Sequence, residues 1–202
     1  MIKNIIFDAG GVLFKTDWGA VKKDIRKKYG FSIFLYSDYP KKIQDKFTGK
    51  LTTGHLSFRD ALKEVSGKKN IKEIAEAYKK SYCKHQKLNR PLVNLVKKLS
   101  KNYEMYYLTN THDLSLEANR ESGLFNIFKK GYGSCEIGFK KPDRRSFNFL
   151  LKKHQLKPRE TLFIDDKERN LIAARKLGMK TILFEDNKRL ILGLKKLGVN
   201  YG

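Results

Sequence analysis

Three aspartates stand at the carboxyl ends of two short apolar segments, one near each end of the chain. Residues 5–7 are apolar and lead into Asp8, and residues 162–164 lead into Asp165 and Asp166. Short apolar runs that end in acids are typical of buried parallel strands, and open α/β sheets bind ligands at the carboxyl ends of their strands. Carboxylates that converge at such an edge have the chemistry of a divalent-metal site.

The rest of the chain supplies the elements of a parallel sheet. Strand-like runs occupy residues 4–8, 105–109, 131–135, 161–165 and 180–184. Helix-like segments lie between the last four of them, at residues 114–122, 145–154 and 169–177. Strands that alternate with helices predict right-handed crossovers, so we expect an α/β protein with a Rossmann-like parallel sheet as its core.

The interval between the first two strands is too long for a single crossover. It contains four helix-like segments, at residues 18–29, 40–47, 57–65 and 71–82, with Ser57 as an N-cap for the third and a further core helix at residues 90–99. We therefore expect a core of residues 1–16 and 90–202 and an inserted α-helical cap of residues 17–89. An insertion that leaves just after Asp8 would cover the site as a lid, although a purely structural helical subdomain fits the same pattern.

The chain is strongly basic. Of its 202 residues, 44 are Lys or Arg and 21 are Asp or Glu, which gives a formal net charge of +23. Such a field attracts polyanions such as nucleic acid, and it also favours a small phosphorylated substrate. The basic residues fall in pairs along the whole chain rather than in one block, which favours lysines spread over solvated helix faces.

Other sequence features bear on the compartment. No apolar stretch reaches about 18 residues, so no membrane span is expected, and the first residues lack the apolar segment of a signal peptide. Cys83 and Cys135 have neither metal-ligand spacing nor a motif around them, so we expect reduced thiols in a cytoplasmic protein. The oligomeric state is not indicated.

Two further motifs lie where the predicted sheet brings them to the edge that holds the acids. Thr109 and Asn110 end the second strand, and Lys141 stands just before Pro142. In chain order the four segments read FDxGGVL, LTN, GxKKPD and FIDDxxxNxxAAxxxGM. This set resembles the haloacid dehalogenase-like (HAD) hydrolase superfamily, in the branch with a helical cap after strand one, and it covers the chain from end to end.

The resemblance implies a phosphoryl-transfer site. Asp8 would attack phosphorus and form an aspartyl-phosphate, while Mg²⁺ cancels the repulsion between the carboxylates and the phosphate. The metal would be held by Asp8, Asp165 and the backbone carbonyl of Gly10. Asp166 would bind it through water or orient Lys141.

The same resemblance assigns the phosphate-binding groups. Thr109, Asn110 and Lys141 would hold the phosphoryl oxygens and offset their charge, so Lys141 counts among the catalytic residues together with Asp8. Asn170 fits two interpretations, a polar residue at the start of a helix or a residue that supports the site.

One position departs from the pattern of phosphatases in this superfamily. They carry a second Asp two places after the nucleophile, which protonates the leaving group and then activates water, and this chain has Gly10 there. General acid–base assistance contributes about 10²–10⁴ in rate. Asp17 or His112 would have to replace it, the substrate would need a good leaving group or a water relay, or activity would be weak.

The leading hypothesis is therefore a Mg²⁺-dependent phosphatase of a small phosphorylated metabolite such as a sugar phosphate or nucleotide. The first alternative is a catalytically weakened HAD-fold binding or regulatory protein, for which the positive charge would serve an acidic partner. The second is a haloacid dehalogenase-type hydrolase, in which the nucleophile attacks carbon without Mg²⁺, but the usual Arg soon after the nucleophile is missing.

Substrate choice would depend on the inward face of the cap, which the sequence does not define. Aromatic and basic candidates, which serve equally well as core residues of a small helical subdomain, are Tyr29, Phe34, Tyr36, Phe47, His55 and, in an expected turn, Lys50.

Overall fold

The structure, a computed structural model, describes residues 1–31, 41–66 and 70–200. Its centre is a five-stranded parallel sheet with the strand order β5-β4-β1-β6-β7. The strands are β1 (Asn4–Phe7), β4 (Glu104–Thr109), β5 (Lys130–Gly133), β6 (Thr161–Asp165) and β7 (Lys180–Leu183). The predicted α/β class with a parallel sheet and an inserted helical region is confirmed.

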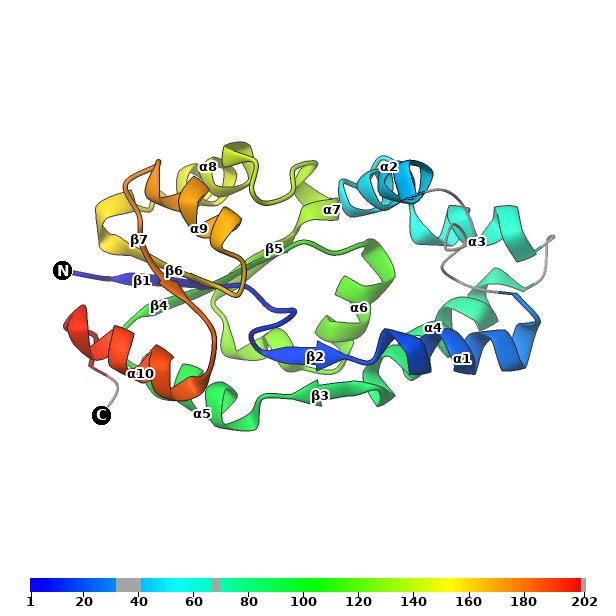
Figure 1. Ribbon diagram of the computed structural model, residues 1–202, viewed down its shortest axis with the longest axis horizontal. Helices are drawn as coiled ribbons and strands as arrows, with labels where there is room; N and C mark the ends of the chain where they lie inside the picture. Colours follow the sequence, from blue (N-terminus) through cyan, green and yellow to red (C-terminus); the bar gives the residue numbers. More distant parts are fainter. Residues whose placement is uncertain (32–40, 67–69, 201–202) are drawn as a thin grey trace.

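Helices cover both faces of this sheet (Figure 1). One face packs against α8 (Arg144–Lys153) and α9 (Glu168–Arg175), and the other against α5 (Arg90–Leu99), α6 (Asp113–Glu121) and α10 (Asn187–Lys196). Alternate residues of a strand face opposite sides of the sheet. Ile6 therefore packs on the side of α8 and α9, and its neighbours Ile5 and Phe7 pack on the side of α5, α6 and α10. This burial on both faces explains why the strands read as continuous apolar runs.

The register of the central strands decides what meets at the carboxyl edge. Phe7 at the end of β1 pairs with Tyr107 of β4 on one side and with Ile164 of β6 on the other. Asp8 therefore leaves the sheet between the ends of these two strands, where Thr109 and Asp165 also lie.

In the described part of the chain, four helices lie between Thr16 and Gln86: α1 (Trp18–Tyr29), α2 (Lys41–Thr52), α3 (Phe58–Ser66) and α4 (Ile71–Lys84). They are joined to the core by a two-stranded antiparallel ribbon of β2 (Phe14–Thr16) and β3 (Gln86–Leu88), in which Thr16 lies opposite Gln86 (Figure 1). The division of the chain into core and cap at residues 17 and 89 stays a prediction.

The inserted helices contact the core along α6. The side chain of Lys79 is 7% exposed, and its Nζ donates to Glu117 at 3.0 Å and to Glu121 at 2.8 Å. Arg59 of α3 also bonds Glu117, at 2.7 Å. Because a buried ammonium loses its hydration, the carboxylates of α6, together with Glu76 at 3.0 Å, compensate the burial of Lys79.

Several element boundaries differ from those expected. The predicted strand 131–135 is wrong at its end: β5 stops at Gly133 and α7 (Ser134–Ile137) follows, because the Ser134 hydroxyl bonds the backbone of Thr111 and turns the chain. The predicted turn at residues 49–50 is also wrong. There α2 continues to Thr52, and the turn falls at Gly54, whose φ of 73° suits glycine.

Three further features complete the fold. The sequence did not indicate the β2–β3 ribbon or α10, and two short 3₁₀ turns lie at Leu124–Ile127 and Pro158–Glu160. Among the helices that the structure describes, none combines the length and apolar character needed to cross a membrane.

Candidate active site

The three aspartates singled out in the sequence meet at the carboxyl edge of the sheet. Asp8, Asp165 and Asp166 each offer a carboxylate oxygen, and these atoms all lie within 4.8 Å of one another. Asp8 is 5% exposed and Asp165 is completely buried. Three acids this close and this poorly hydrated repel one another strongly, so the fold must supply compensating positive charge.

Lys141 supplies one such charge. Its Nζ lies 2.9 Å from Asp8 Oδ1 and 2.8 Å from Asp165 Oδ2, and the residue is 2% exposed. Burial acts to lower the pKa of Lys141, but the charges of Asp8 and Asp165 outweigh it and raise the pKa, so the amine stays protonated. The Asn110 side chain fixes the Lys141 backbone, accepting from its N–H at 2.9 Å and donating to its carbonyl at 2.8 Å.

Further donors orient the two buried carboxylates. The Asn170 amide donates to both oxygens of Asp165 at 2.9 Å, and the Lys167 backbone N–H donates to Asp165 Oδ1 at 2.8 Å. The backbone N–H of Ala9 donates to Asp8 Oδ1 at 2.8 Å. Of the two interpretations of Asn170, the contacts therefore favour support of the site over a simple role in starting α9.

The donor set fits a hard divalent cation. In the described part of the chain, two oxygens beside the acids, Asp166 Oδ1 and Asn170 Oδ1, are buried without a hydrogen-bond partner. Burial raises the pKa of Asp8, opposed by Lys141, and it also raises the pKa of Asp166. A cation bound by these oxygens would satisfy them and favour the ionised carboxylates, and an all-oxygen set is what Mg²⁺ prefers.

Two consecutive glycines shape the loop after β1. A Cβ at Gly10 would meet no atom within 4 Å, so open space lies where the superfamily's second Asp would project. Gly11 is the opposite case, because its φ is 89° and a Cβ there would lie 2.4 Å from Asp166 Oδ2. The Asp166 carboxylate thus packs directly on the Gly11 backbone.

We expect Gly11→Ala to displace Asp166 and to destabilise the fold by about 1–3 kcal/mol, because φ is positive and the carboxylate cannot keep its place. Urea unfolding would measure the loss of stability, and calorimetric titration would show weaker Mg²⁺ binding. Gly30→Ala is the matched control: its φ is also positive, at 79°, but its Cβ would meet nothing within 4 Å. Equal Mg²⁺ affinity in both variants would contradict the displacement of Asp166.

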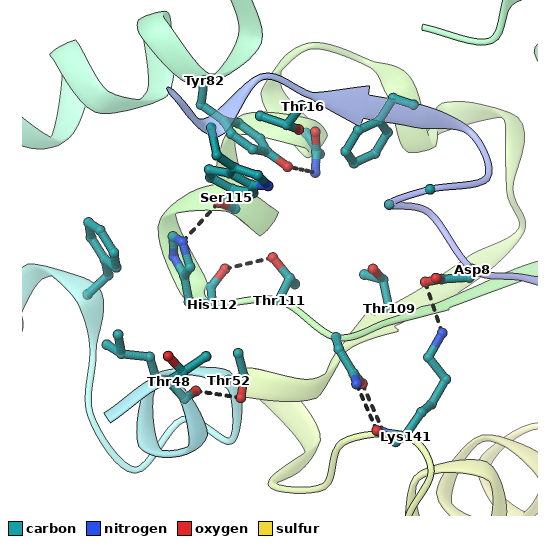
Figure 2. A pocket seen from close by; sticks show the side chains of 18 of the residues that line it. Asp8, Thr16, Thr48, Thr52, Tyr82, Thr109, Thr111, His112, Ser115 and Lys141 are labelled. Atoms are coloured by element: carbon teal, nitrogen blue, oxygen red, sulfur yellow. Dashed lines mark hydrogen bonds and ion pairs between the residues drawn. The ribbon is translucent and has the colours of Figure 1, made fainter. Parts of the chain in front are cut away.

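The acids open into a cavity of about 700 Å³ between the sheet edge and the inserted helices (Figure 2). Figure 2 shows Asp8, Thr109 and Lys141 on one side of it, and Tyr82, His112 and Ser115 across from them. Residues from the motif loops that line the cavity are Asp8, Gly10, Gly11, Thr109, Asn110, Lys141, Asp166 and Asn170. The structure thus brings the predicted site residues together around one space, with Asp165 buried just behind.

The two candidates for a replacement acid lie in different surroundings. The exposed Asp17 is the N-cap of α1, accepting from the Ala20 backbone N–H at 3.0 Å, and does not line the cavity. His112 does line it, but Nε2 lies 3.1 Å from the Tyr78 hydroxyl and 3.0 Å from Ser115 Oγ. Burial lowers the pKa of His112, with Asp113 opposing the shift, so the ring is neutral near pH 7.

The residues that the inserted helices present to the cavity are not those suggested by the sequence. Tyr29, Phe47, Lys50 and His55 do not line it, and Phe34 and Tyr36 lie outside the described residues. The lining side chains come instead from the first turns of α1, from α2, from the first residue of α3 and from the second half of α4: Trp18, Lys22, Thr48, Leu51, Thr52, Phe58, Tyr78 and Tyr82. Proximity in the chain to the predicted junctions of core and cap, at residues 17 and 89, was the signal that could have indicated Trp18 and Tyr82.

Comparison with known proteins agrees with this geometry. The chain is 29% identical over 191 residues to D-ribitol-5-phosphate phosphatase of Bacteroides thetaiotaomicron, covering 90% of this chain and 91% of that protein. A HAD-family enzyme of the same organism, solved with magnesium and inorganic phosphate, superposes with a TM-score of 0.75 at 27% identity over 94% of this chain and 99% of the other.

A predicted HAD-like family hydrolase of Porphyromonas gingivalis superposes over 99% of both chains, with a TM-score of 0.72 at 26% identity. Residues 2–178 match the haloacid dehalogenase-like hydrolase family. With the four motifs gathered at one sheet edge, the chain belongs to the haloacid dehalogenase-like hydrolases.

Proposed function

We propose that this protein is a Mg²⁺-dependent phosphatase of a small phosphorylated metabolite, with Asp8 as the nucleophile. The observation that carries the proposal is the buried ion pair of Lys141 with Asp8 and Asp165 beside Asp166, at the mouth of a cavity large enough for a metabolite. The phosphatase from Bacteroides thetaiotaomicron and the related structure with magnesium and phosphate support the same class of reaction.

Each residue has a distinct task in this proposal. Asp8, oriented by the Ala9 N–H, attacks phosphorus and forms an aspartyl-phosphate, which water then hydrolyses. Lys141 holds a positive charge beside the Asp8 carboxylate, where it offsets the charge of the incoming phosphoryl oxygens. The hydroxyl of the buried Thr109 and the free N–H of the Asn110 amide bind those oxygens.

Mg²⁺, when bound by Asp8, Asp165, Asp166 and the Gly10 carbonyl, supplies charge neutralisation that lets a phosphate dianion approach three acids. Asn170 and Lys141 orient the Asp165 carboxylate by donating hydrogen bonds to it.

Removal of the metal is the direct test of this proposal. We expect phosphate release from a panel of sugar phosphates and nucleotides to fall at least about 10²-fold when EDTA replaces MgCl₂, because the carboxylates then repel the substrate. Addition of excess Mg²⁺ would restore the rate. Hydrolysis of phosphate esters that is unchanged in EDTA would contradict the proposed role of the metal.

A further inference from the structure

A group of ring side chains lines part of the cavity, and we call this group the aromatic wall. It is formed by Phe14, Trp18, Phe58, Tyr78, Tyr82 and His112, all of which line the cavity. Most of its rings are packed into the core, with Tyr78 1% and Tyr82 3% exposed, whereas Trp18 is 42% exposed. The rings come from β2, three inserted helices and the loop after β4. Segments that are far apart in the sequence thus bring ring side chains to the cavity that the proposed phosphate site also lines.

The rings of the wall form a continuous series of contacts in space. Tyr82 lies 6.5 Å from Phe14, 5.4 Å from Trp18 and 5.9 Å from Tyr78, measured between ring centroids. Phe58 continues the series at 4.9 Å from Tyr78 and stacks on His112 at 4.2 Å. Edge-to-face and offset-stacked rings attract a further ring beyond what buried area alone provides.

The hydroxyl groups of the wall are bonded to protein atoms. The Tyr78 hydroxyl lies 2.7 Å from Ser115 Oγ and 3.1 Å from His112 Nε2. The Tyr82 hydroxyl accepts from the Asn119 amide at 3.2 Å. A flat apolar group that lies against these rings leaves the hydroxyl groups with their partners and so carries no cost of an unsatisfied hydrogen bond.

The wall lies across the cavity from Asp8 and Lys141 (Figure 2). Two of its members follow the loops of the proposed site closely in the chain: the Phe14 carbonyl accepts from the Gly11 N–H at 2.8 Å, and His112 follows Asn110 by one intervening residue. A group bonded to the phosphate oxygen would therefore extend from the acids into the cavity that these rings line. The same place is open at Gly10, where no side chain stands ready to protonate a leaving oxygen.

The absence of an acid at Gly10 is compatible with a leaving group that needs no proton, and the rings are compatible with an aromatic one. Phenols ionise near pH 10, as tyrosine does, whereas the pKa of an aliphatic alcohol is far higher and close to that of water. A phenolate can leave without general acid help, but an alkoxide cannot. Missing acid and aromatic surface thus point to the same chemical class.

We propose that the substrate is an aryl phosphate, the phosphate ester of a phenol, with its ring against the aromatic wall; this rests on the proposed phosphatase function. Asp8 attacks phosphorus, and the bond from phosphorus to the aryl oxygen breaks, so the oxygen leaves with the electron pair as a phenolate. Water then attacks the aspartyl-phosphate, which releases inorganic phosphate and restores Asp8. The phenolate takes its proton from solvent.

Recognition can be measured without turnover, because Trp18 is the single tryptophan of the sequence. Benzylphosphonate is a non-hydrolysable analogue of phenyl phosphate, and 3,4-dihydroxybutylphosphonate is the matched analogue of glycerol 3-phosphate. With MgCl₂ present, we expect calorimetry to show benzylphosphonate binding at least about tenfold more tightly, and only benzylphosphonate to change Trp18 fluorescence. Equal affinity, or an unchanged Trp18 signal with benzylphosphonate, overturns the proposal.

A variant of the wall tests its contribution to this affinity. Trp18 is 42% exposed, so Trp18→Ala should fold, and we expect it to weaken benzylphosphonate about fivefold while leaving the dihydroxy analogue unchanged. Leu192→Ala removes a large apolar side chain that is 58% exposed on α10 and should alter neither affinity. An equal loss for both phosphonates in Trp18→Ala contradicts ring recognition.

Leaving-group dependence tests the part of the proposal that concerns Gly10. We expect kcat/KM for phenyl phosphate to exceed that for glycerol 3-phosphate at least about 10²-fold, and Gly10→Asp to raise the glycerol 3-phosphate value about 10²-fold with little change for phenyl phosphate. If Gly10→Asp raises kcat/KM equally for both esters, or for neither, the proposed link between Gly10 and the leaving group is contradicted. Hydrolysis of polyol phosphates without aryl preference would defeat this inference alone, whereas benzylphosphonate binding without turnover of any ester would defeat the phosphatase function and leave only the recognition of the ring.

Discussion

Asp8→Asn is expected to lower phosphate release at least about 10⁴-fold, because an amide cannot attack phosphorus and the proposed reaction begins with that attack. The substitution keeps the size of the side chain, and the amide oxygen can still accept from Lys141 and from the Ala9 N–H. Loss of activity would therefore report chemistry rather than misfolding. The measurement is inorganic phosphate released under single-turnover and steady-state conditions, with circular dichroism to verify the fold.

The same chemical change away from the site provides the control. Asp186 is the N-cap of α10 and accepts from the Arg189 N–H at 2.8 Å. Asparagine caps helices about as well as aspartate, so Asp186→Asn should leave both stability and turnover unchanged. Activity of Asp8→Asn within tenfold of the unsubstituted protein would show that another group is the nucleophile.

Lys141→Met is expected to cost about 3–5 kcal/mol of stability in EDTA, because it leaves Asp8 and Asp165 buried without their cation. It should also lower turnover about 10³-fold, since a charge beside the transferred phosphoryl group is lost. Added Mg²⁺ should recover part of the stability but little of the activity, because the ion can replace the missing charge but not its position. Urea unfolding with and without Mg²⁺ measures the first effect.

Lys140 offers a matched comparison for this second prediction. It is the neighbouring lysine in the same motif and is exposed. Lys140→Met should change stability by less than about 0.5 kcal/mol, as is usual for exposed positions. A loss below about 1 kcal/mol in Lys141→Met would mean that the acids are neutralised by protonation rather than by this lysine.

The two alternative functions predict different outcomes in the same assays. A dehalogenase would hydrolyse 2-chloropropionate in EDTA and would still need Asp8. A binding or regulatory protein would retain salt-sensitive binding of RNA or DNA without releasing phosphate from any ester. The buried oxygens of Asp166 and Asn170, which match a cation, are the observation that favours metal-dependent chemistry over both.

The sequence was sufficient to predict the sheet and the gathering of its motifs. Residues that end the strands of a parallel sheet lie at the same edge, which is why the sequence predicts that Asp8, Thr109 and Asp165 converge. The strand order and register that make them neighbours come from the structure. The role of Asn170 was left open because its spacing from Asp165 also suits a helix start. Only the observed contact, with one amide donating to both carboxylate oxygens, distinguishes these cases.

The sequence predicted four helical segments in the insertion, but it did not predict which of their side chains face the cavity. Helical spacing shows which side of a helix is buried, yet it does not show whether that side meets other helices, the core or a cavity. Tyr29 illustrates the difficulty: its ring packs on Phe31 and its hydroxyl donates to Glu73. The three-residue strands of the ribbon are too short to give a period of two, so they left no readable pattern.

The β2–β3 ribbon joins two parts of the chain that can vary independently, the α/β core and the inserted helices. Because Thr16 lies opposite Gln86, the polypeptide leaves the α/β core and returns to it at adjacent points. A segment with neighbouring ends can be exchanged for one of different length or shape while the strands beneath it keep their alignment. Chimeras that graft the helices of a relative between these two positions should inherit the donor's preference for substrates and keep this chain's reaction, so recognition and chemistry are free to diverge independently.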